Sequence, residues 1–171
     1  RGRCGHDPPR ASVTVVVALG SNLGDRLGHL RLGVSHLPEV VAVSRVYETE
    51  PVGGPDGQPA YLNAVVLLAD GVDVRTAFAA GQDAERAAGR ERVVRWGPRT
   101  LDVDVVSADG AVDDPDLTVP HPRAAERPFV LLPWLDVEPR AMLAGRSVRE
   151  LVAALDCSGV RPTELMLTGA G

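Results

Sequence analysis

The stretch that most constrains the fold is Val13 to Leu19, which is nearly continuous apolar sequence. Successive side chains of a strand point to opposite faces, so a strand without a polar face is expected to be buried on both faces. The run ends in Gly20-Ser21-Asn22, which predicts a tight turn. We therefore expect an interior strand that leads directly into the next element.

Further elements follow from hydrophobic periodicity. Apolar residues three and four positions apart between Gly24 and Leu37 predict an amphipathic helix, with Asn22 or Asp25 as its N-cap. Residues 49–60 contain three prolines and three glycines and predict a loop of functional length. The remaining predictions are strands over 40–47, 61–69 and 101–106, a helix over 74–88, a short helical segment over 129–135 and a final helix over 148–155.

The predicted order, βαββαβ, is that of the ferredoxin-like plan, in which helices cover one side of an antiparallel sheet. We therefore predict an α+β, ferredoxin-like βαββαβ sandwich with C-terminal helical additions. A chain of 171 residues with 44% hydrophobic content has about the size of one domain. We expect a disordered arm over 1–12, a single catalytic domain over 13–160 and a C-terminal tail over 161–171.

Composition excludes several classes of function. All eighteen basic residues are arginine, which excludes a Walker A loop and every Schiff-base mechanism, because both need lysine. A net charge of −5 argues against broad nucleic-acid binding. Val13 to Leu19 is too short to span a membrane, so we expect a cytoplasmic protein without a membrane anchor. Cys4 and Cys157 lack metal-ligand spacing, and we expect neither a disulfide framework nor a zinc site.

A pair of acids alternates with apolar residues in the segment Leu101 to Val105. On a strand, Asp102 and Asp104 would share one face about 6–7 Å apart, while Leu101, Val103 and Val105 would take the packed face. Hard carboxylate oxygens suit Mg²⁺, which completes its shell with water and substrate phosphates. Taken alone, the pair is explained equally well by a wet strand face.

A cluster of arginines precedes the acids. Residues 86–99 hold Arg86, Arg90, Arg92, Arg95 and Arg99 but only one acid, Glu91. The planar guanidinium fork matches phosphate oxygens, so arginines beside paired carboxylates supply both halves of a Mg²⁺–polyphosphate site. The combination favours a nucleoside-triphosphate site over a solvated loop.

Four motifs together resemble those of the 6-hydroxymethyl-7,8-dihydropterin pyrophosphokinase family of folate biosynthesis. They are Gly20-Ser21-Asn22, Pro59 to Asn63, Arg95 to Asp104 and Val119 to Arg123, within about residues 13–140. The resemblance implies the ferredoxin-like fold, and transfer of the β,γ-diphosphoryl group of ATP to the hydroxymethyl oxygen of the dihydropterin, which leaves AMP.

The resemblance also implies roles for individual residues on the nucleotide side. Asp102 and Asp104 would hold two Mg²⁺ ions that bridge the triphosphate and neutralise charge. Arg90 and Arg99 would contact phosphates, with Arg92 assisting, and His121 and Arg127 would reach the nucleotide from the later loop. Val93-Val94 makes the arginine loop less polar than the family pattern.

On the pterin side, the resemblance implies a stacked substrate. Tyr61 and Phe129 would be the two stacking rings, Asn63 would read the polar edge of the pterin, and Trp96 would close over it. Each of these, taken singly, is also explained as a core or loop residue. Pro122 stands where some members of the family carry an aromatic residue.

Two other classes of function fit the sequence less well. A small-molecule-sensing domain of ferredoxin-like fold has no need of a two-metal polyphosphate site, and a two-metal nuclease or nucleotidyl transferase would favour a basic surface. The partners expected are ATP and the dihydropterin alcohol, without nucleic acid or membrane, and we expect a monomer. The base that removes the hydroxyl proton stays open between a metal-bound carboxylate such as Asp102 and metal activation of the alcohol alone.

Overall fold

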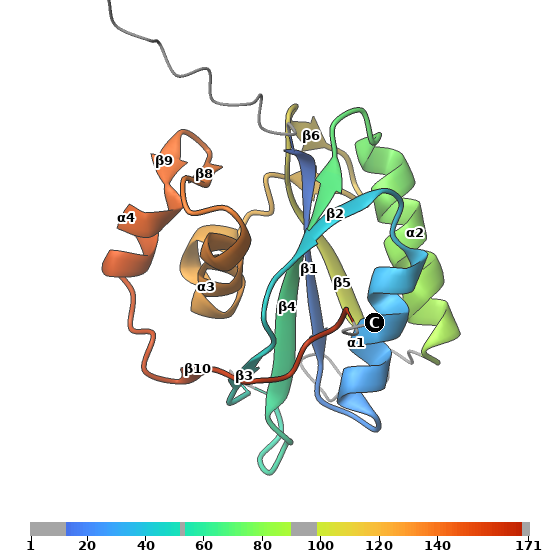
Figure 1. The fold of residues 1–171 in the computed structure, drawn as a ribbon, viewed down its shortest axis with the longest axis vertical. Helices are drawn as coiled ribbons and strands as arrows, with labels where there is room; N and C mark the ends of the chain where they lie inside the picture. Colours follow the sequence, from blue (N-terminus) through green and yellow to red (C-terminus); the bar gives the residue numbers. More distant parts are fainter. Residues whose placement is uncertain (1–12, 52–53, 90–98, 169–171) are drawn as a thin grey trace, which may run out of the picture.

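The computed structural model describes residues 13–51, 54–89 and 99–168. Figure 1 shows a central sheet with helices on both of its faces. The helices and strands are β1 (Val13–Ser21), α1 (Arg26–His36), β2 (Val40–Val43), β3 (Tyr47–Thr49), β4 (Tyr61–Ala69), α2 (Val74–Ala87), β5 (Asp102–Ala108), β6 (Val112–Asp113), β7 (Thr118–Val119), the 3₁₀ turn Ala124–Glu126, α3 (Pro128–Val137), β8 (Met142–Leu143), β9 (Arg146–Ser147), α4 (Val148–Ala153) and β10 (Val160–Pro162).

The main sheet has the strand order β10-β3-β4-β1-β5, and β2 also pairs with β4. Every pairing in it is antiparallel. The α+β class and the antiparallel sheet predicted from sequence are therefore confirmed. Strand β4 has the predicted bounds, 61–69, and Asp25 rather than Asn22 caps α1, since its Oδ1 accepts from the backbone of Gly28 at 3.0 Å.

Strand β1 is buried on both faces, as its apolar run predicted. Val15, Val17 and Leu19 pack into the core beneath α1 and α2, while Val16 and Ala18 pack into a second core cluster with α3. The prediction that helices cover only one side is wrong. Helix α3 covers the other face, where its residues Val130, Leu131 and Trp134 are buried in the second core cluster. Further along β5, Val106 is buried in the same cluster.

The strand predicted over 40–47 is two strands, β2 and β3. Ser44 breaks it: its backbone N–H donates to the carbonyl of Val65 at 2.9 Å, and its hydroxyl accepts from the Val65 N–H at 2.9 Å. Beyond it, Val46 bonds to the end of the chain, donating to Leu165 and accepting from Thr163. A polar side chain that competes for the partner strand's backbone thus ends β2.

The packed fold extends beyond residue 160, where the sequence placed the end of the domain. Strand β10 pairs with β3 over three residues, and Leu167 is only 6% exposed within the core beneath α1 and α2. From β10 this C-terminal segment runs past the edge of the sheet to α1 in Figure 1, where Arg31 donates to the carbonyl of Met166 at 3.3 Å.

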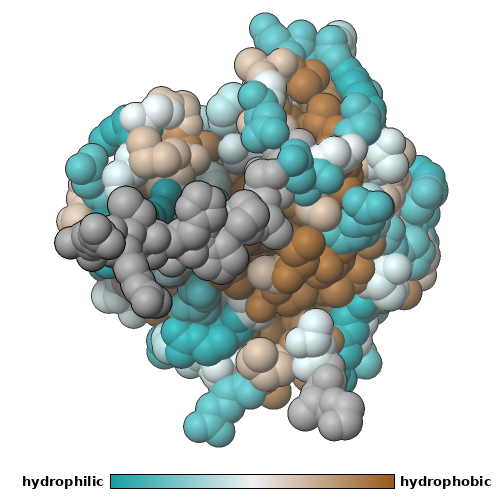
Figure 2. All heavy atoms as spheres, turned by 45° about the horizontal axis from the view of Figure 1, so that its top comes forward, coloured by the Kyte–Doolittle hydropathy of each residue, from teal (hydrophilic) through white to brown (hydrophobic). Residues whose placement is uncertain are grey.

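The surface mixes polar residues with exposed apolar ones. Figure 2 shows hydrophobic residues gathered on part of one face, surrounded by hydrophilic residues. The large exposed hydrophobic residues include Val41 on β2, which is 45% exposed, and Met142. Among residues 13–51, 54–89 and 99–168, no helix has the length and apolar character needed to cross a bilayer.

Candidate active site

The acid pair lies where β5 begins, next to the end of β1. Gly20 pairs with Asp102 and Ala18 with Asp104, while Val103 between them packs against the core beneath α1 and α2. The two carboxylates therefore share the opposite face of the strand, as predicted, and their side chains are 28% and 36% exposed. Two partly buried carboxylates side by side on a strand are rigidly held, as a cation-binding site requires.

Each acid faces an arginine. The Arg99 guanidinium lies 3.4 Å from Asp102, and that of Arg127 lies 3.6 Å from Asp104. The same Arg127 guanidinium sits 5.8 Å from the centre of the Phe129 ring. The structure thus brings four of the predicted site residues and one predicted stacking ring to one end of the sheet.

His121 joins this group from the loop after β7. Its backbone N–H donates to Val106 at 2.9 Å, and its Nδ1 accepts from the backbone of Arg123 at 3.2 Å. Burial lowers the pKa of His121, the positive charges of Arg127 and Arg123 lower it further, and the Asp102 carboxylate partly opposes them. Since its Nδ1 accepts, the neutral imidazole carries its proton on Nε2 and can donate a hydrogen bond there without adding charge.

A second group lies on the neighbouring strand β4. Asn63 is 5% exposed, and its Nδ2 donates to the hydroxyl of Thr49 at 2.9 Å. A Cβ placed on Gly20 would lie 3.1 Å from the Asn63 Oδ1 and 3.7 Å from the Tyr61 ring. Tyr61 and Asn63 therefore lie on the same side of the sheet, as predicted, and Gly20 leaves the space between them and β1 free of a side chain.

Phe129 has a double role. It is the second residue of α3 and is partly buried against the second core cluster, so packing accounts for part of its position. Its ring also carries the Arg127 guanidinium toward the acids. The core explanation therefore holds for Phe129, and its role as a pterin-stacking ring stays a prediction.

Asn22 is the residue whose importance the sequence did not reveal beyond its place in a motif. It is fully buried, its Oδ1 accepts from the Arg99 N–H at 2.7 Å, and its Nδ2 donates to the carbonyl of Pro59 at 3.2 Å. From the sequence, Asn22 is predicted only as a candidate helix N-cap, because asparagine is common at that position. The residues around Asn22 in the sequence do not distinguish a helix cap from a residue that bridges Arg99 and Pro59.

Three predicted residues, Arg90, Arg92 and Trp96, lie outside the described residues, and their roles stay predictions. Within the described part of the chain, no group of three or more His, Cys, Asp or Glu side chains could hold a metal ion. The candidate ligands for Mg²⁺ within the described ranges are the two aspartates, and Mg²⁺ commonly takes its remaining ligands from phosphate and water.

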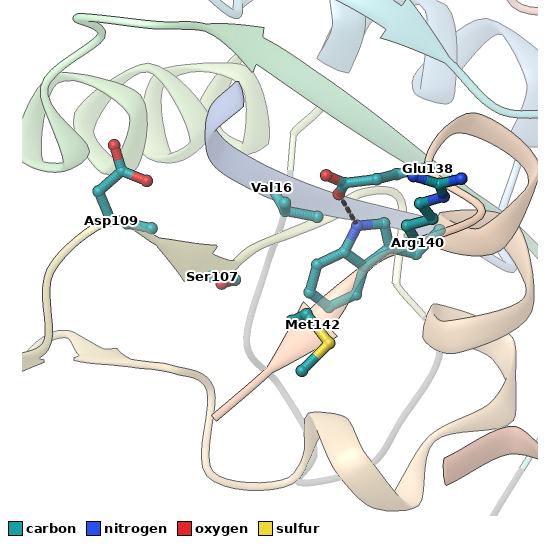
Figure 3. A pocket seen from close by; sticks show the side chains of 8 residues that line it. Val16, Ser107, Asp109, Glu138, Arg140 and Met142 are labelled. Atoms are coloured by element: carbon teal, nitrogen blue, oxygen red, sulfur yellow. Dashed lines mark hydrogen bonds between the residues drawn. The ribbon is translucent and has the colours of Figure 1, made fainter. Parts of the chain in front are cut away.

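A cavity of about 340 Å³ lies elsewhere, at the other end of β5. Figure 3 shows Ser107 and Asp109 on one side of it and Glu138, Arg140 and Met142 on the other, with the Trp134 indole donating to Glu138 at 2.7 Å. None of the predicted site residues lines this cavity. This cavity is therefore distinct from the acid pair.

Comparison with known proteins identifies the family. Residues 16–139 match the model of the 7,8-dihydro-6-hydroxymethylpterin-pyrophosphokinase family. The chain belongs to this family. It is 47% identical to the 2-amino-4-hydroxy-6-hydroxymethyldihydropteridine pyrophosphokinase of Mycobacterium leprae, with 90% of each chain covered. It is 40% identical to the protein of the same name from Methylorubrum extorquens, with 86% of this chain and 97% of that one covered.

Solved structures agree on the fold. The chain is similar to Plasmodium falciparum HPPK-DHPS, with a TM-score of 0.61 at 12% identity, over 85% of this chain. A second structure of that protein, determined with pterin and p-hydroxybenzoate, gives a TM-score of 0.62 over 91% of this chain. This chain spans 44% and 48% of those longer chains, and at such low identity the likeness concerns the fold alone.

Proposed function

We propose that this chain transfers the diphosphoryl group of ATP to 6-hydroxymethyl-7,8-dihydropterin, with release of AMP, in folate biosynthesis. The observation that carries the proposal is the convergence, at one end of the sheet, of an acid pair faced by two arginines with the Gly20, Tyr61 and Asn63 group on β1 and β4. Family membership supports the same reaction.

Asp102 and Asp104 are the residues that would hold Mg²⁺, and we propose two ions. Their hard oxygens and partial exposure suit an ion that keeps water and phosphate ligands. Bound Mg²⁺ supplies charge neutralisation on the triphosphate and fixes its orientation. Without nucleotide, Arg99 and Arg127 offset the charge of the two carboxylates.

The arginines are proposed to change partners when ATP binds. Arg99 and Arg127 are 24% and 19% exposed in their side chains, so each can turn a guanidinium edge from its aspartate toward a phosphate. A guanidinium gains more from a bidentate phosphate contact than from a single carboxylate contact at more than 3 Å. We propose that Arg90 and Arg92 add phosphate contacts and that His121 contacts the nucleotide as a neutral imidazole.

The pterin is proposed to bind between the Tyr61 and Phe129 rings. The Asn63 Nδ2 donates to Thr49, and the Oδ1 of the same amide is the atom proposed to accept from the amino edge of the ring. Gly20 lies under this position, and a side chain there would enter it. Trp96 is proposed to cover the bound pterin from the arginine loop.

The strand order, with α1 and α2 crossing one face, supports a ferredoxin-like classification with α3 and α4 as additions. A cytoplasmic monomer acting on small molecules, without nucleic acid or membrane, is part of the same proposal. So is a single catalytic domain that starts at residue 13, whereas the arm expected over 1–12 lies outside the described residues.

The reaction is tested by incubating the protein with ATP, Mg²⁺ and the dihydropterin alcohol and separating the nucleotides. AMP in equal amount to the pterin diphosphate is expected. ADP would mean an ordinary kinase, and the absence of turnover with intact ligand binding would mean a sensor. Omission of Mg²⁺, with chelator present, should abolish AMP formation, and its persistence would contradict the role given to Asp102 and Asp104.

A further inference from the structure

Asn22 lies where the two halves of the proposed site meet. We propose that it is a positioning residue that couples the binding of nucleotide and pterin, because one carboxamide holds both the backbone that presents Arg99 and the loop that leads into Tyr61. The inference rests on the proposed function, since it assumes that these two halves bind those two substrates.

On the nucleotide side, Asn22 is bonded to Arg99 twice. The Asn22 N–H donates to the Arg99 carbonyl at 3.1 Å, and the Arg99 N–H donates to the Asn22 Oδ1 at 2.7 Å. These bonds fix the backbone of Arg99 three residues before Asp102, to which the Arg99 guanidinium also reaches. A movement of this backbone toward bound phosphate therefore pulls directly on the carboxamide.

On the pterin side, the same side chain holds the end of the 54–60 loop. Its Nδ2 donates to the Pro59 carbonyl at 3.2 Å and to the Gln58 Oε1 at 3.3 Å. Arg26 fixes the next residue, donating to the Ala60 carbonyl at 2.9 Å. Tyr61 follows immediately, so the position of its ring depends on this short segment.

Burial makes the arrangement selective for an amide. Asn22 is 0% exposed, and it uses its Oδ1 as an acceptor and its Nδ2 as a donor in opposite directions. A carboxylate would place an acceptor against the Pro59 carbonyl, which costs more than the loss of one bond. The hydroxyls of the flanking Ser21 and the nearby Thr100 are buried without a hydrogen-bond partner among the described residues, so neither shares this task.

The physical consequence is a coupling between sites. If bound nucleotide restrains Arg99, Asn22 passes that restraint to residues 58–60, and pterin then binds a loop that has already been ordered. By linkage, pterin must tighten nucleotide binding by the same factor. A residue that only stabilises the fold would change both affinities together without changing this factor.

The test measures that factor by calorimetry. The affinity of 6-hydroxymethylpterin is determined with and without Mg²⁺ and a non-hydrolysable ATP analogue, and the ratio of the two dissociation constants is the coupling factor. We expect a factor of at least about 5 in the parent protein, in the usual range for coupled sites. In Asn22→Asp and Asn22→Ala it should fall toward 1.

Two further variants control the experiment. Ser44 is 1% exposed, and its hydroxyl likewise accepts from a backbone N–H, that of Val65, and donates to a carbonyl. Ser44→Ala should lower the melting temperature and leave the coupling factor unchanged. Gln58→Ala removes one of the two pterin-side contacts of the Asn22 amide, together with the bond from Gln58 to the Pro55 carbonyl, and should lower the factor while the nucleotide affinity alone stays near that of the parent. It also keeps the test available if the Asn22 variants fail to fold.

The outcomes separate this inference from the proposed function. A parent protein that makes AMP but shows a coupling factor of 1, or Asn22 or Gln58 variants that fold and keep the parent's factor, would overturn the role of Asn22 alone. An equal loss of coupling in Ser44→Ala would overturn it too, as general loosening. A parent protein that makes no AMP would instead overturn the proposed function.

Discussion

At the scale of single residues, the site is built from side chains that alternate across β5. Leu101 and Val105 are buried at 0% and 4%, whereas Asp102 and Asp104 point to the other face and keep part of their surface in water. The proposed metal ligands therefore lie apart from the core beneath α1 and α2. We predict that mutation separates the proposed metal binding of the strand from its packing.

Asp102→Asn and Asp104→Asn should each reduce turnover on the order of 100-fold or more, because a fixed charge acting on developing charge is lost. Stability without ligand should change by only about 0.5 kcal/mol, as at other sites where no core packing is lost. Rates of AMP formation and thermal melts check this. Asp113→Asn, an exposed acid on β6, is the control and should leave both unchanged. Large losses of melting temperature in the two site variants would make the acids structural.

Gly20→Ala tests the pterin position. The added Cβ would lie 3.1 Å from the Asn63 Oδ1, tighter than an ordinary contact, so the amide has to shift. We expect a pterin affinity at least about tenfold weaker, equivalent to about 1.4 kcal/mol, with nucleotide affinity nearly unchanged. Gly110→Ala, whose Cβ would meet nothing within 4 Å, is the matched control. Equal losses for both ligands would place Gly20 in a purely structural role.

The sequence correctly predicted that Asp102 and Asp104 share one face of the strand, because the alternation of side chains along a strand is set by the backbone alone. It predicted Tyr61 and Asn63 on one face for the same reason. Asn22 could not be read in this way, since its partners at Pro59 and Arg99 are 37 and 77 residues away. Contacts of that kind depend on how the strands are ordered in the sheet, which no local pattern contains.

At the scale of the elements, two predictions were in conflict and the structure decides between them. The apolar run of β1 required cover on both faces, while the ferredoxin-like plan offered helices on one. Helix α3 resolves the conflict by burying Trp134 at 1% exposure against Val16 and Val65. The apolar run of β1 thus predicted cover on both faces of the sheet, which the βαββαβ order of the elements did not.

Helix α3 is also tied to β3 by a polar contact. The Tyr47 hydroxyl donates to Asp136 at 2.9 Å, and Arg45 lies on the same carboxylate at 3.1 Å. Burial, with the bond to Asp136 and its charge, raises the pKa of Tyr47 to about 12, against the opposing charge of Arg45. Tyr47 therefore resists ionisation in the folded protein.

This shift predicts an alkaline instability. The folded pKa of Tyr47 lies above the unfolded value of about 10, so its contribution to stability is present below pH 10 and is lost as the pH rises through about 12. The chain has no lysine, which leaves few other side chains that titrate in this window. Urea unfolding at a series of pH values should show the loss in the parent and less of it in Tyr47→Phe.

At the scale of the whole molecule, the sheet separates two core clusters, and the site lies at one end of the sheet between them. We expect a monomer, and the partly exposed strand β2 gives a reason to test this prediction. This strand pairs with β4, and Val41 on it is 45% exposed. Exposed apolar strands at a sheet edge are the usual route to self-association.

Sedimentation of the parent protein should give a monomer mass close to 18.0 kDa. If a dimer forms instead, Val41→Lys should return it to a monomer, because a buried lysine in a strand pairing is costly. A dimer that persists in Val41→Lys would place the interface elsewhere. Met142→Lys, on the short hairpin beside α4, is a comparison at another exposed apolar residue.

The end of the chain offers the clearest whole-molecule test, since the sequence placed a tail where the structure has a packed segment. Leu167 is 6% exposed within the core beneath α1 and α2, whereas Leu165 two residues earlier is 40% exposed. Leu167→Ala should lower the free energy of unfolding by about 2–4 kcal/mol, the usual cost of truncating a buried leucine. Leu165→Ala should change it by no more than about 0.5 kcal/mol.

Urea denaturation of the two variants decides between a docked segment and a tail. Docking also predicts an effect on the site, because β10 pairs with β3, and Thr49 at the end of β3 holds the amide of Asn63. Leu167→Ala should therefore weaken pterin binding more than nucleotide binding, while Leu165→Ala changes neither. If both variants unfold at the parent's urea concentration, the segment contributes nothing to the fold, and residues 161–171 are the tail that the sequence suggested.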